Sequence, residues 1–321
     1  MENTSRLLFR HDAELAGRHW LLVDADDAAL ATLPGASRCW HSDRPDGAAT
    51  QSSMLPAVPP ETDLLIVVLP KSLPRLHYLV AALAGQLSRA TELWLVGAAK
   101  GGIKGGVSQL ARLGVEMALV DSARHCKLFR GFLSPAPFEQ TDFERRFEVD
   151  DVTVCSLPGV FSEARLDAGT RLLLDALQDQ TMPATALDIG CGAGVISAWL
   201  ARRGVAVTAV DISATAVACT EATLAANSLT ATVRQSHLFS DVSGRFQWLV
   251  TNPPFHQGRE QTFAVTRELL QQAPRMLTPG GALWLVANRH LPYDQWLQSA
   301  FSQVEIMARN SAFTVYRAGH G

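Results

Sequence analysis

The chain has 321 residues, of which 47% are hydrophobic and 18% charged, and its net charge at neutral pH is −3. These values are typical of a globular protein with a large hydrophobic core and enough residues for two domains. The sequence has no uninterrupted apolar run of about 18 residues, so we expect no membrane span. Five scattered cysteines without metal-ligand spacing, and a first segment without the features of a secretory signal, predict a cytoplasmic protein with reduced thiols and no bound metal.

Apolar segments of strand length recur through the first half of the chain. They lie at residues 19–23, 64–69, 92–96 and 115–120, and segments of helix length separate them. Continuous apolar strands are typical of a parallel sheet that is buried on both faces. We expect a crossover helix at residues 78–87 and a loop at residues 48–60, which are rich in Ala, Ser and Pro.

The first half contains segments similar in sequence to the second half, as in an internal repeat. Residues 63–71 resemble residues 246–254, and each segment is followed by a leucine-rich helix and a similar strand, Glu92-Leu93-Trp94-Leu95-Val96 in one and Ala282-Leu283-Trp284-Leu285-Val286 in the other. We interpret the first half as a duplicate that has lost its site, with Leu69-Pro70-Lys71 where the second half has Asn-Pro-Pro-Phe. Chance similarity between apolar strands is the alternative.

Basic residues are concentrated in the middle of the first half. Residues 71–130 contain nine basic and three acidic side chains, whereas residues 1–63 contain five and ten. The segment Lys100-Gly101-Gly102-Ile103-Lys104-Gly105-Gly106 combines exposed backbone N–H groups with point charges, which suits an RNA phosphate. An ordinary solvated face and a flexible surface turn are the alternatives.

The two halves are joined by residues of linker composition, at 134–137 and 142–151, so we place the domain boundary near residue 145. A short strand at residues 152–155 follows it. The segment Leu157-Pro158-Gly159-Val160-Phe161-Ser162 comes next, and a helix with leucines on one face begins near Leu166.

A glycine-rich turn, Leu187-Asp188-Ile189-Gly190-Cys191-Gly192-Ala193-Gly194, stands between a buried strand at residues 186–189 and a helix at residues 195–200. Glycines without Cβ atoms let backbone approach a ligand near the positive end of the helix. The spacing differs from the G-x-G-x-x-G of dinucleotide binding. With Asp188 it favours S-adenosylmethionine as the cofactor, held at Asp188, Gly190, Gly192 and Gly194.

Further candidate cofactor contacts follow along the chain. Asp211 ends the strand at residues 206–210, where a carboxylate accepts both ribose hydroxyls, and Ile212 packs on the adenine. An N-cap role for Asp211 is the alternative. His237, after a third strand at residues 231–234, is a candidate at the adenine edge or a surface histidine. Phe161 is a candidate lid residue or a core aromatic.

The candidate catalytic residues are Asn252, Pro253, Pro254 and Phe255, after the strand at residues 246–250. A ring-conjugated amine is a poor nucleophile. The side-chain oxygen of Asn252 and the carbonyl oxygen of Pro253 can accept its two N–H hydrogens and direct the nitrogen lone pair at the methyl group of the cofactor. Proline fixes the direction of that carbonyl, and Phe255 can stack on the base. Asn252 therefore also lies beside the cofactor.

These motifs resemble those of the bacterial 16S ribosomal RNA guanine-N2 methyltransferases of the RsmC type. The resemblance extends over the whole length and implies two tandem class I, Rossmann-like α/β domains: a degenerate docking domain at residues 1–145 and a catalytic domain at residues 146–321. It also implies methylation of guanine 1207 of 16S rRNA within the assembled 30S subunit, with S-adenosyl-L-methionine as the cofactor. We expect a monomer, because one chain carries both domains.

Three alternatives stay open at this point. The first is a guanine-N2 methyltransferase of 23S rRNA, which shares the duplicated layout. The second is a protein methyltransferase acting on a glutamine side-chain amide. The third is a non-catalytic RNA-binding factor, which the intact motifs of the second half disfavour.

Overall fold

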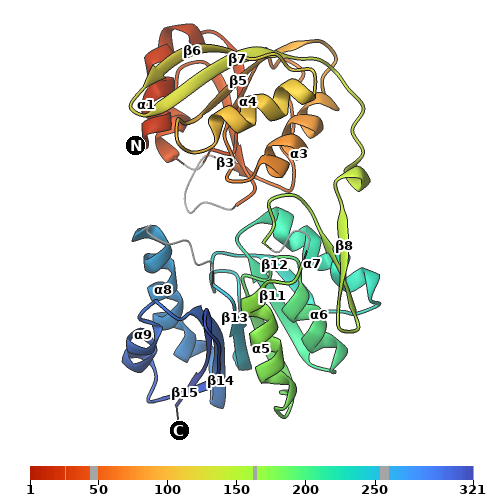
Figure 1. Cartoon of the computed structure of the whole chain (residues 1–321), viewed down its shortest axis with the longest axis vertical. Helices are drawn as coiled ribbons and strands as arrows, with labels where there is room; N and C mark the ends of the chain where they lie inside the picture. Colours follow the sequence, from red (N-terminus) through yellow and green to blue (C-terminus); the bar gives the residue numbers. More distant parts are fainter. Residues whose placement is uncertain (26, 44–49, 162–164, 254–259, 321) are drawn as a thin grey trace. The chain divides into compact units, whose positions relative to one another are not determined.

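The computed structural model describes residues 1–25, 27–43, 50–161, 165–253 and 260–320, with side chains described except at residues 50, 51 and 260–263. The chain divides into two compact units, unit 1 at residues Met1–Glu144 and unit 2 at residues Arg145–Gly321. Each unit is an α/β structure built around one seven-stranded sheet (Figure 1).

Unit 1 places its helices on both faces of its sheet. One face packs against α3 and α4, through leucines such as Leu79 and Leu110, and the other against α1 and α2, through Leu7 and Leu15. The helices are α1 (Asn3–Leu8), α2 (Asp12–Leu15), α3 (Leu73–Ala84) and α4 (Ile103–Arg112), with 3-10 helices at Phe9–His11, Ala28–Thr32 and Gln140–Asp142. The strands are β1 (His19–Val23), β2 (Ala36–His41), β3 (Thr50–Ser52), β4 (Leu64–Val68), β5 (Thr91–Ala98), β6 (Ala118–Ala123) and β7 (Cys126–Leu133).

Unit 2 begins with a separate hairpin and then forms its own sheet. One face of that sheet packs against α8 and α9, through residues such as Leu269 and Leu297. The helices are α5 (Ala168–Gln178), α6 (Val195–Arg202), α7 (Ala214–Ala226), α8 (Glu260–Met276) and α9 (Tyr293–Ala300). The strands are β8 (Arg145–Val149), β9 (Val152–Ser156), β10 (Thr185–Ile189), β11 (Ala206–Asp211), β12 (Thr232–Gln235), β13 (Phe246–Thr251), β14 (Leu277–Asn288), β15 (Gln303–Arg309) and β16 (Phe313–Gly319).

The two sheets have the same topology. Their strand orders are β3-β2-β1-β4-β5-β7-β6 and β12-β11-β10-β13-β14-β16-β15. Each last hairpin even carries an irregularity at the same place, after Leu119 in β6 and after Ile306 in β15. The predicted fold of two tandem Rossmann-like units is therefore confirmed. The sequence similarity between the two halves reflects a shared topology rather than chance.

The parallel sheet predicted for the first half is a mixed sheet, and so is the sheet of unit 2. β7 runs antiparallel to β5 and β6, and β16 runs antiparallel to β14 and β15. The connection between β6 and β7 contains only two residues, too few for the crossover that a parallel pair needs. The strands β2 and β7 were not predicted, because Ser37, Arg38 and His41 interrupt the apolar character of β2 and β7 carries two basic side chains.

Three local predictions also need correction. The helix predicted at residues 78–87 is α3, which begins at Leu73 because the Ser72 hydroxyl caps it by accepting the Arg75 N–H at 3.1 Å. The predicted loop at residues 48–60 contains β3, and residues 44–49 lie outside the described ranges. The segment 142–151 is not merely a linker, since β8 pairs with β9 there.

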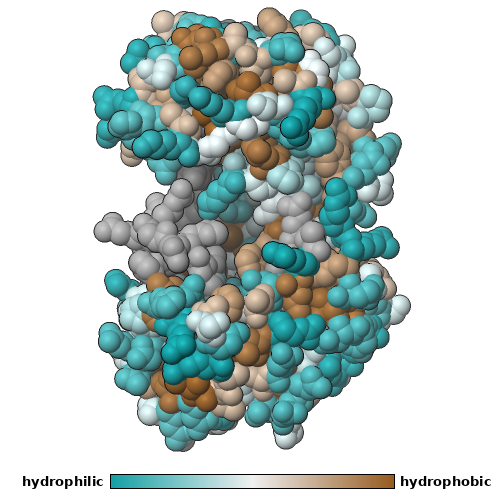
Figure 2. Space-filling model, viewed as in Figure 1, coloured by the Kyte–Doolittle hydropathy of each residue, from teal (hydrophilic) through white to brown (hydrophobic). Residues whose placement is uncertain are grey.

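The surface and the helices carry two further observations. Hydrophilic and hydrophobic residues are interspersed over the face of each unit that Figure 2 shows. Among the described residues, no helix is both long enough and apolar enough to cross a membrane.

Candidate active site

The candidate site lies at the carboxyl edge of the sheet of unit 2. β10 is parallel to both β11 and β13, and Ile189 is in register with Val210 on one side and Thr251 on the other. The glycine turn after Ile189, Asp211 and Asn252 therefore follow three adjacent strands at one edge. This is the edge at which open α/β sheets bind ligands.

The glycines of the turn have different roles. Gly190 and Gly192 have φ of 75° and 56°, and a Cβ at either would enter open space, with only the Phe161 carbonyl oxygen at 4.0 Å from that of Gly192. A Cβ at Gly194 would lie 2.9 Å from the Cα of Thr220 in α7. The first two glycines therefore leave room for a ligand, whereas Gly194 permits α6 to pack on α7.

Asp211 is joined to the glycine turn. Its Oδ2 accepts the Gly192 N–H at 3.0 Å, and its Oδ1 accepts the Ser213 N–H at 2.9 Å. The N-cap residue of α7 is Ser213, so the N-cap interpretation of Asp211 is wrong. The carboxylate is half-buried, and a carboxylate has about four lone-pair sites, so it can accept hydroxyl donors in addition. The half-buried Ile212 follows it directly.

Asp188 lies inside the unit rather than at its surface. It is fully buried, and its Oδ2 accepts the Ser197 hydroxyl at 2.6 Å. Its Oδ1 has no hydrogen-bond partner among the described residues. Burial, with a contribution from Asp211, raises the pKa of Asp188 from 3.8 to about 7. Asp188 therefore supports the first turn of α6, and a direct cofactor contact stays a prediction.

The side-chain amide of Asn252 is held on one side. Its Nδ2 donates to Asp167 Oδ2 at 3.1 Å and to Thr170 Oγ1 at 2.9 Å. Because a carboxylate only accepts, the nitrogen must face Asp167 and the carbonyl oxygen is turned away from it. Pro253 is buried, and Pro254 and Phe255 lie outside the described residues.

The two remaining predicted residues lie as follows. Phe161 is 57% exposed, so it is not a core aromatic, and its carbonyl oxygen lies close to Gly192. His237 is half-buried in the turn after β12, where its carbonyl oxygen accepts the Ser240 N–H at 3.0 Å. Their contacts with a cofactor stay predictions.

Sequence reasoning missed Asp167 and Thr170. They begin α5, where the Asp167 side chain caps the helix by accepting the Thr170 N–H at 3.0 Å. The signal was present as an Asp followed three residues later by Thr at a helix start. By itself this pattern indicates only where a helix begins, and it says nothing of a contact with Asn252.

Unit 1 lacks the corresponding amide. Leu95 of β5 and Leu285 of β14 are at the same position of the repeated strand. Leu95 is in register with Val67, and Leu285 is in register with Thr251, so Val67 corresponds to Thr251. Val68 therefore occupies the position of Asn252, which shifts the equivalence predicted with Leu69 by one residue. A valine side chain cannot accept or donate a hydrogen bond, so the copy in unit 1 cannot hold an amine in this way.

Comparisons with known proteins agree with this geometry. The family model described as "Methyltransferase small domain" matches residues 151–317, and "Methyltransferase small domain N-terminal" matches residues 5–147. The ribosomal RNA small subunit methyltransferase C of Alcanivorax borkumensis is 48% identical over 99% of both chains, and that of Chromohalobacter salexigens is 38% identical over 94% of both. The chain belongs to the ribosomal RNA small subunit methyltransferase C family.

A solved structure extends the comparison for this member of the methyltransferase C family. The T. thermophilus 16S rRNA N2 G1207 methyltransferase, in complex with AdoMet and guanosine, has a TM-score of 0.82 and 24% identity, covering 94% of this chain and 88% of that one. This likeness supports the fold. The predictions of the family and of an S-adenosylmethionine-dependent methyltransferase are confirmed.

The residues of the site fit that cofactor. Gly190 and Gly192 leave a cradle that a Cβ would fill, and Asp211 presents a carboxylate beside it. The G-x-G-x-x-G spacing of dinucleotide binding would place the third glycine at position 195, where this chain has Val195. The half-buried Asp211 carboxylate beside this space suits the hydroxyl groups of a nucleoside.

Proposed function

We propose that the protein transfers a methyl group from S-adenosylmethionine to the exocyclic N2 of guanine 1207 of 16S rRNA in the 30S subunit. Its relatives are named for methylation of the ribosomal RNA small subunit, and the similar T. thermophilus structure is named for G1207. We propose further that it acts in the cytoplasm and as a monomer. Both copies of the fold are present in one chain, and the five cysteines are buried free thiols.

The orientation of Asn252 carries the proposal. Its amide nitrogen is engaged by α5, so its oxygen is available at the sheet edge that also holds Gly192 and Asp211. An oxygen there can accept an N–H of a guanine amine. The carbonyl oxygen of Pro253 accepts the second N–H in the same proposal, and the roles of Pro254 and Phe255 stay predictions.

The protein then acts by orientation rather than by strong acid or base chemistry. The bound cofactor supplies a methyl group on a positively charged sulfur. Asn252 and Pro253 draw the amine hydrogens aside, so that the nitrogen lone pair points away from the ring plane and toward that methyl group. Positive charge develops on the nitrogen during transfer, and the two oxygens stabilise it. Once the methyl group has been transferred, the proton leaves to solvent.

Unit 1 supplies the surface that docks the RNA in this proposal. Fewer of its basic side chains are available for RNA phosphates than the sequence count suggests. Arg75 is paired with Asp24 and Arg130 with Glu14, so these two arginines are engaged within the unit. Lys100 and Lys104 are exposed at the start of α4 and form no ion pair with a described residue. These lysines are the better candidates for RNA phosphates.

The test is a set of parallel incubations with methyl-labelled cofactor. The acceptors are purified 30S subunits, 50S subunits, naked 16S rRNA and release factor, each taken from cells that lack the endogenous enzyme. Label at one guanine of the 30S subunit, absent with Asn252→Ala, supports the proposal. Label in 50S subunits favours the 23S rRNA alternative, and label in release factor alone favours glutamine methylation. Either result rejects the proposal.

Cytoplasmic action and the monomer are tested separately. Cell fractionation should recover the protein with ribosomal particles rather than with membranes. Light scattering across a concentration series should give one mass close to 34.7 kDa. A doubled mass at every concentration would reject the monomer while leaving the chemistry untouched.

A further inference from the structure

The first inference concerns how the Asn252 amide is oriented. An amide nitrogen has two hydrogens, and here they meet two acceptors, Asp167 Oδ2 and Thr170 Oγ1. Thr170 is only 6% exposed, so water is largely kept from its hydroxyl. The amide therefore cannot rotate without losing two hydrogen bonds, and its oxygen stays directed away from α5.

The start of α5 is built to place the Asp167 carboxylate. The same Oδ2 that accepts the Asn252 amide also accepts the Thr170 N–H at 3.0 Å as the N-cap of the helix. Gly169 makes room for it, since a Cβ there would lie 2.9 Å from Oδ2 and 3.2 Å from the ring of Phe313. The carboxylate is therefore fixed by the helix and by the missing side chain together.

We propose that Asp167 and Thr170 are positioning residues for methyl transfer. They hold the nitrogen of Asn252, so that its oxygen is presented to the N–H of the acceptor base. The negative charge of Asp167 polarises the amide and makes its oxygen a stronger acceptor as positive charge develops on the attacking nitrogen. This inference rests on the proposed function, because it assigns a role only within amine methylation.

The clean test is the pair Thr170→Val and Thr170→Ser. The valine keeps the shape but removes the hydroxyl acceptor, whereas the serine keeps the acceptor. Loss of one hydrogen bond at a reacting centre predicts a fall in kcat of about 10-fold for Thr170→Val and a change of at most about two-fold for Thr170→Ser. The KM for 30S subunits and the Kd for S-adenosylmethionine should stay unchanged in both.

Two outcomes overturn the inference. One is a Thr170→Val enzyme with the wild-type kcat. The other is a fall in kcat together with a weakened Kd for S-adenosylmethionine, because Thr170 would then be a cofactor contact. Failure of the proposed function is distinguishable, since the wild-type enzyme itself would then leave the 30S subunit unlabelled.

A second test uses pH. The substitution Asn252→Asp places a carboxyl group against Asp167, and two carboxyl groups in contact do not both ionise readily. When the introduced carboxyl group is protonated, we expect it to imitate the amide, with its O–H toward Asp167 and its C=O toward the amine. The activity of Asn252→Asp relative to wild type should therefore rise as pH falls from about 8 to about 6, and that of Asn252→Ala should stay flat.

The exchanged pair completes this test. In Asp167→Asn with Asn252→Asp, the amide and the carboxylate have changed places, and the carboxylate keeps one oxygen for the amine. Asparagine is as good an N-cap as aspartate, so α5 should be retained. Activity near neutral pH should exceed that of Asn252→Asp alone, with a weaker pH dependence. No difference between the single and double variants would contradict the contact.

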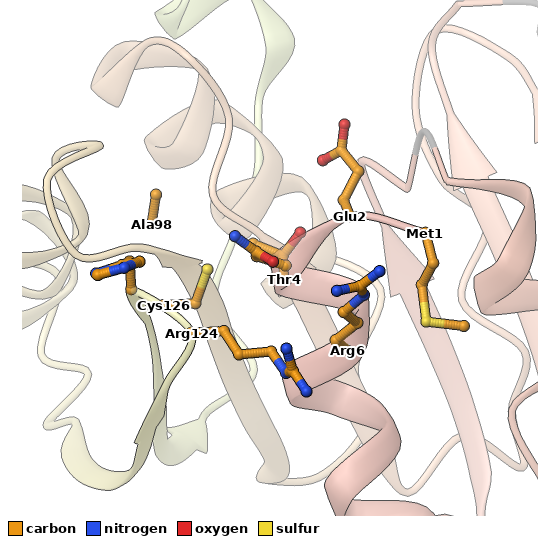
Figure 3. A pocket seen from close by; sticks show the side chains of 9 residues that line it. Met1, Glu2, Thr4, Arg6, Ala98, Arg124 and Cys126 are labelled. Carbon is orange, nitrogen blue, oxygen red and sulfur yellow. The ribbon is translucent and has the colours of Figure 1, made fainter.

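The second inference is carried by a different feature, a basic cavity in unit 1. It has a volume of about 480 Å³ and lies between the first residues of the chain, the end of β5 and the two-residue turn from β6 to β7. Arg6 on α1 and Arg124 on the turn flank the same hollow (Figure 3). His125 lines it as well, and Glu2 contributes one carboxylate.

The conformation of this turn indicates a use for its side chains. Arg124 and His125 have φ of 50° and 62°, a turn in which Asn-Gly is the favoured pair. A residue with a side chain is strained in this region, and strain of this kind is typical of functional positions. The turn is anchored, because the His125 carbonyl oxygen accepts the Ala99 N–H at 2.7 Å. Lys100 follows that anchor directly.

We infer that this cavity binds backbone phosphates of the RNA substrate. Arg6 and Arg124 are exposed and form no ion pair with a described residue, so their guanidinium groups are available for bidentate phosphate contacts. The sequence could not indicate this, because Arg6 lies in the acidic first segment and is brought to Arg124 only by the fold. The inference rests on the proposed RNA substrate.

The test compares two double variants. Arg6→Gln with Arg124→Gln removes both cations of the cavity, whereas Arg89→Gln with Arg112→Gln removes two exposed arginines of the same unit, before β5 and at the end of α4. The first pair should raise the KM for 30S subunits about 10-fold and lower the salt slope of RNA binding by about one to two, with kcat kept. The second should do neither. Equal behaviour of the two pairs would overturn the inference while leaving methyl transfer by the wild type intact.

Discussion

Asp24 in unit 1 occupies the position of Gly190 in unit 2. Val23 pairs with Trp40 as Ile189 pairs with Val210, and the next residue in each unit has a left-handed backbone, with φ of 62° and 75°. Where Gly190 leaves open space, the Asp24 carboxylate accepts a hydrogen bond from Arg75 Nη2 at 2.8 Å. The left-handed backbone at the first position of the ligand turn is thus retained in unit 1, while an ion pair lies where Gly190 leaves open space.

This ion pair predicts that Arg75→Met destabilises unit 1 without affecting cofactor binding. The side chains of Arg75 and Asp24 are 11% and 10% exposed, so removing the guanidinium leaves a largely buried charge. The free energy of unfolding should fall by about 3 kcal/mol. Urea denaturation measures it, and calorimetry should still give one cofactor per chain with unchanged Kd. Two cofactors per wild-type chain would contradict the filled site.

A second prediction separates two glycines of the cofactor turn. Gly192→Ala costs about 1–2 kcal/mol because of its positive φ and places a methyl group in the space left for the ligand, so cofactor affinity should fall about 10-fold or more. Gly194→Ala adds a clash with Thr220 at 2.9 Å, so it should lower the melting temperature more. Thermal unfolding and calorimetry on both variants check this. The same loss of stability in both would contradict the division of roles.

Local sequence signals predict the residues that follow strands, but they do not predict long-range contacts between side chains. The glycine turn and Asp211 are predictable because each directly follows a strand, where period and spacing are local signals. The contact of Asp167 with Asn252 joins residues 85 positions apart, and no local pattern encodes it. Arg75 and Arg130 count as free basic residues in the sequence for the same reason, since their acidic partners come from distant segments. Long-range side-chain pairing is the part that only the fold supplies.

Asp188 predicts a pH-dependent stability difference. Burial raises the pKa of Asp188 from 3.8 to about 7, so between these pH values the unfolded chain releases a proton that the folded chain retains. Stability from this group is therefore full below about pH 4 and is lost as pH rises toward 7. Asp188→Asn has no such loss, so its melting temperature relative to wild type should rise from about pH 5 to about pH 8. A constant difference across this range would contradict the raised pKa.

The proposed role of Asn252 predicts that Asn252→Ala loses methyl transfer but keeps cofactor binding. The variant removes the oxygen that accepts the amine N–H, and removal of one such stabilising group typically lowers kcat by about 100- to 1,000-fold. Cofactor affinity should be largely kept, because Gly190, Gly192 and Asp211 are untouched. Single-turnover transfer to 30S subunits and calorimetry measure the two effects. Unchanged turnover would exclude the amine-holding role.

Lys100 and Lys104 predict a salt-dependent effect on RNA binding. Both are exposed at the start of α4, where Gly102 is the N-cap residue with a φ of 94°, and neither pairs with a described acidic residue. If each contacts one phosphate, Lys100→Gln with Lys104→Gln should reduce the slope of log affinity against log salt by about 1.4 to 1.8. Affinity should therefore fall most at low salt, and kcat at saturating 30S subunits should stay the same. Arg89→Gln with Arg112→Gln again serves as the control with equal charge removed. If affinity and slope match that control, these lysines belong to an ordinary solvated surface.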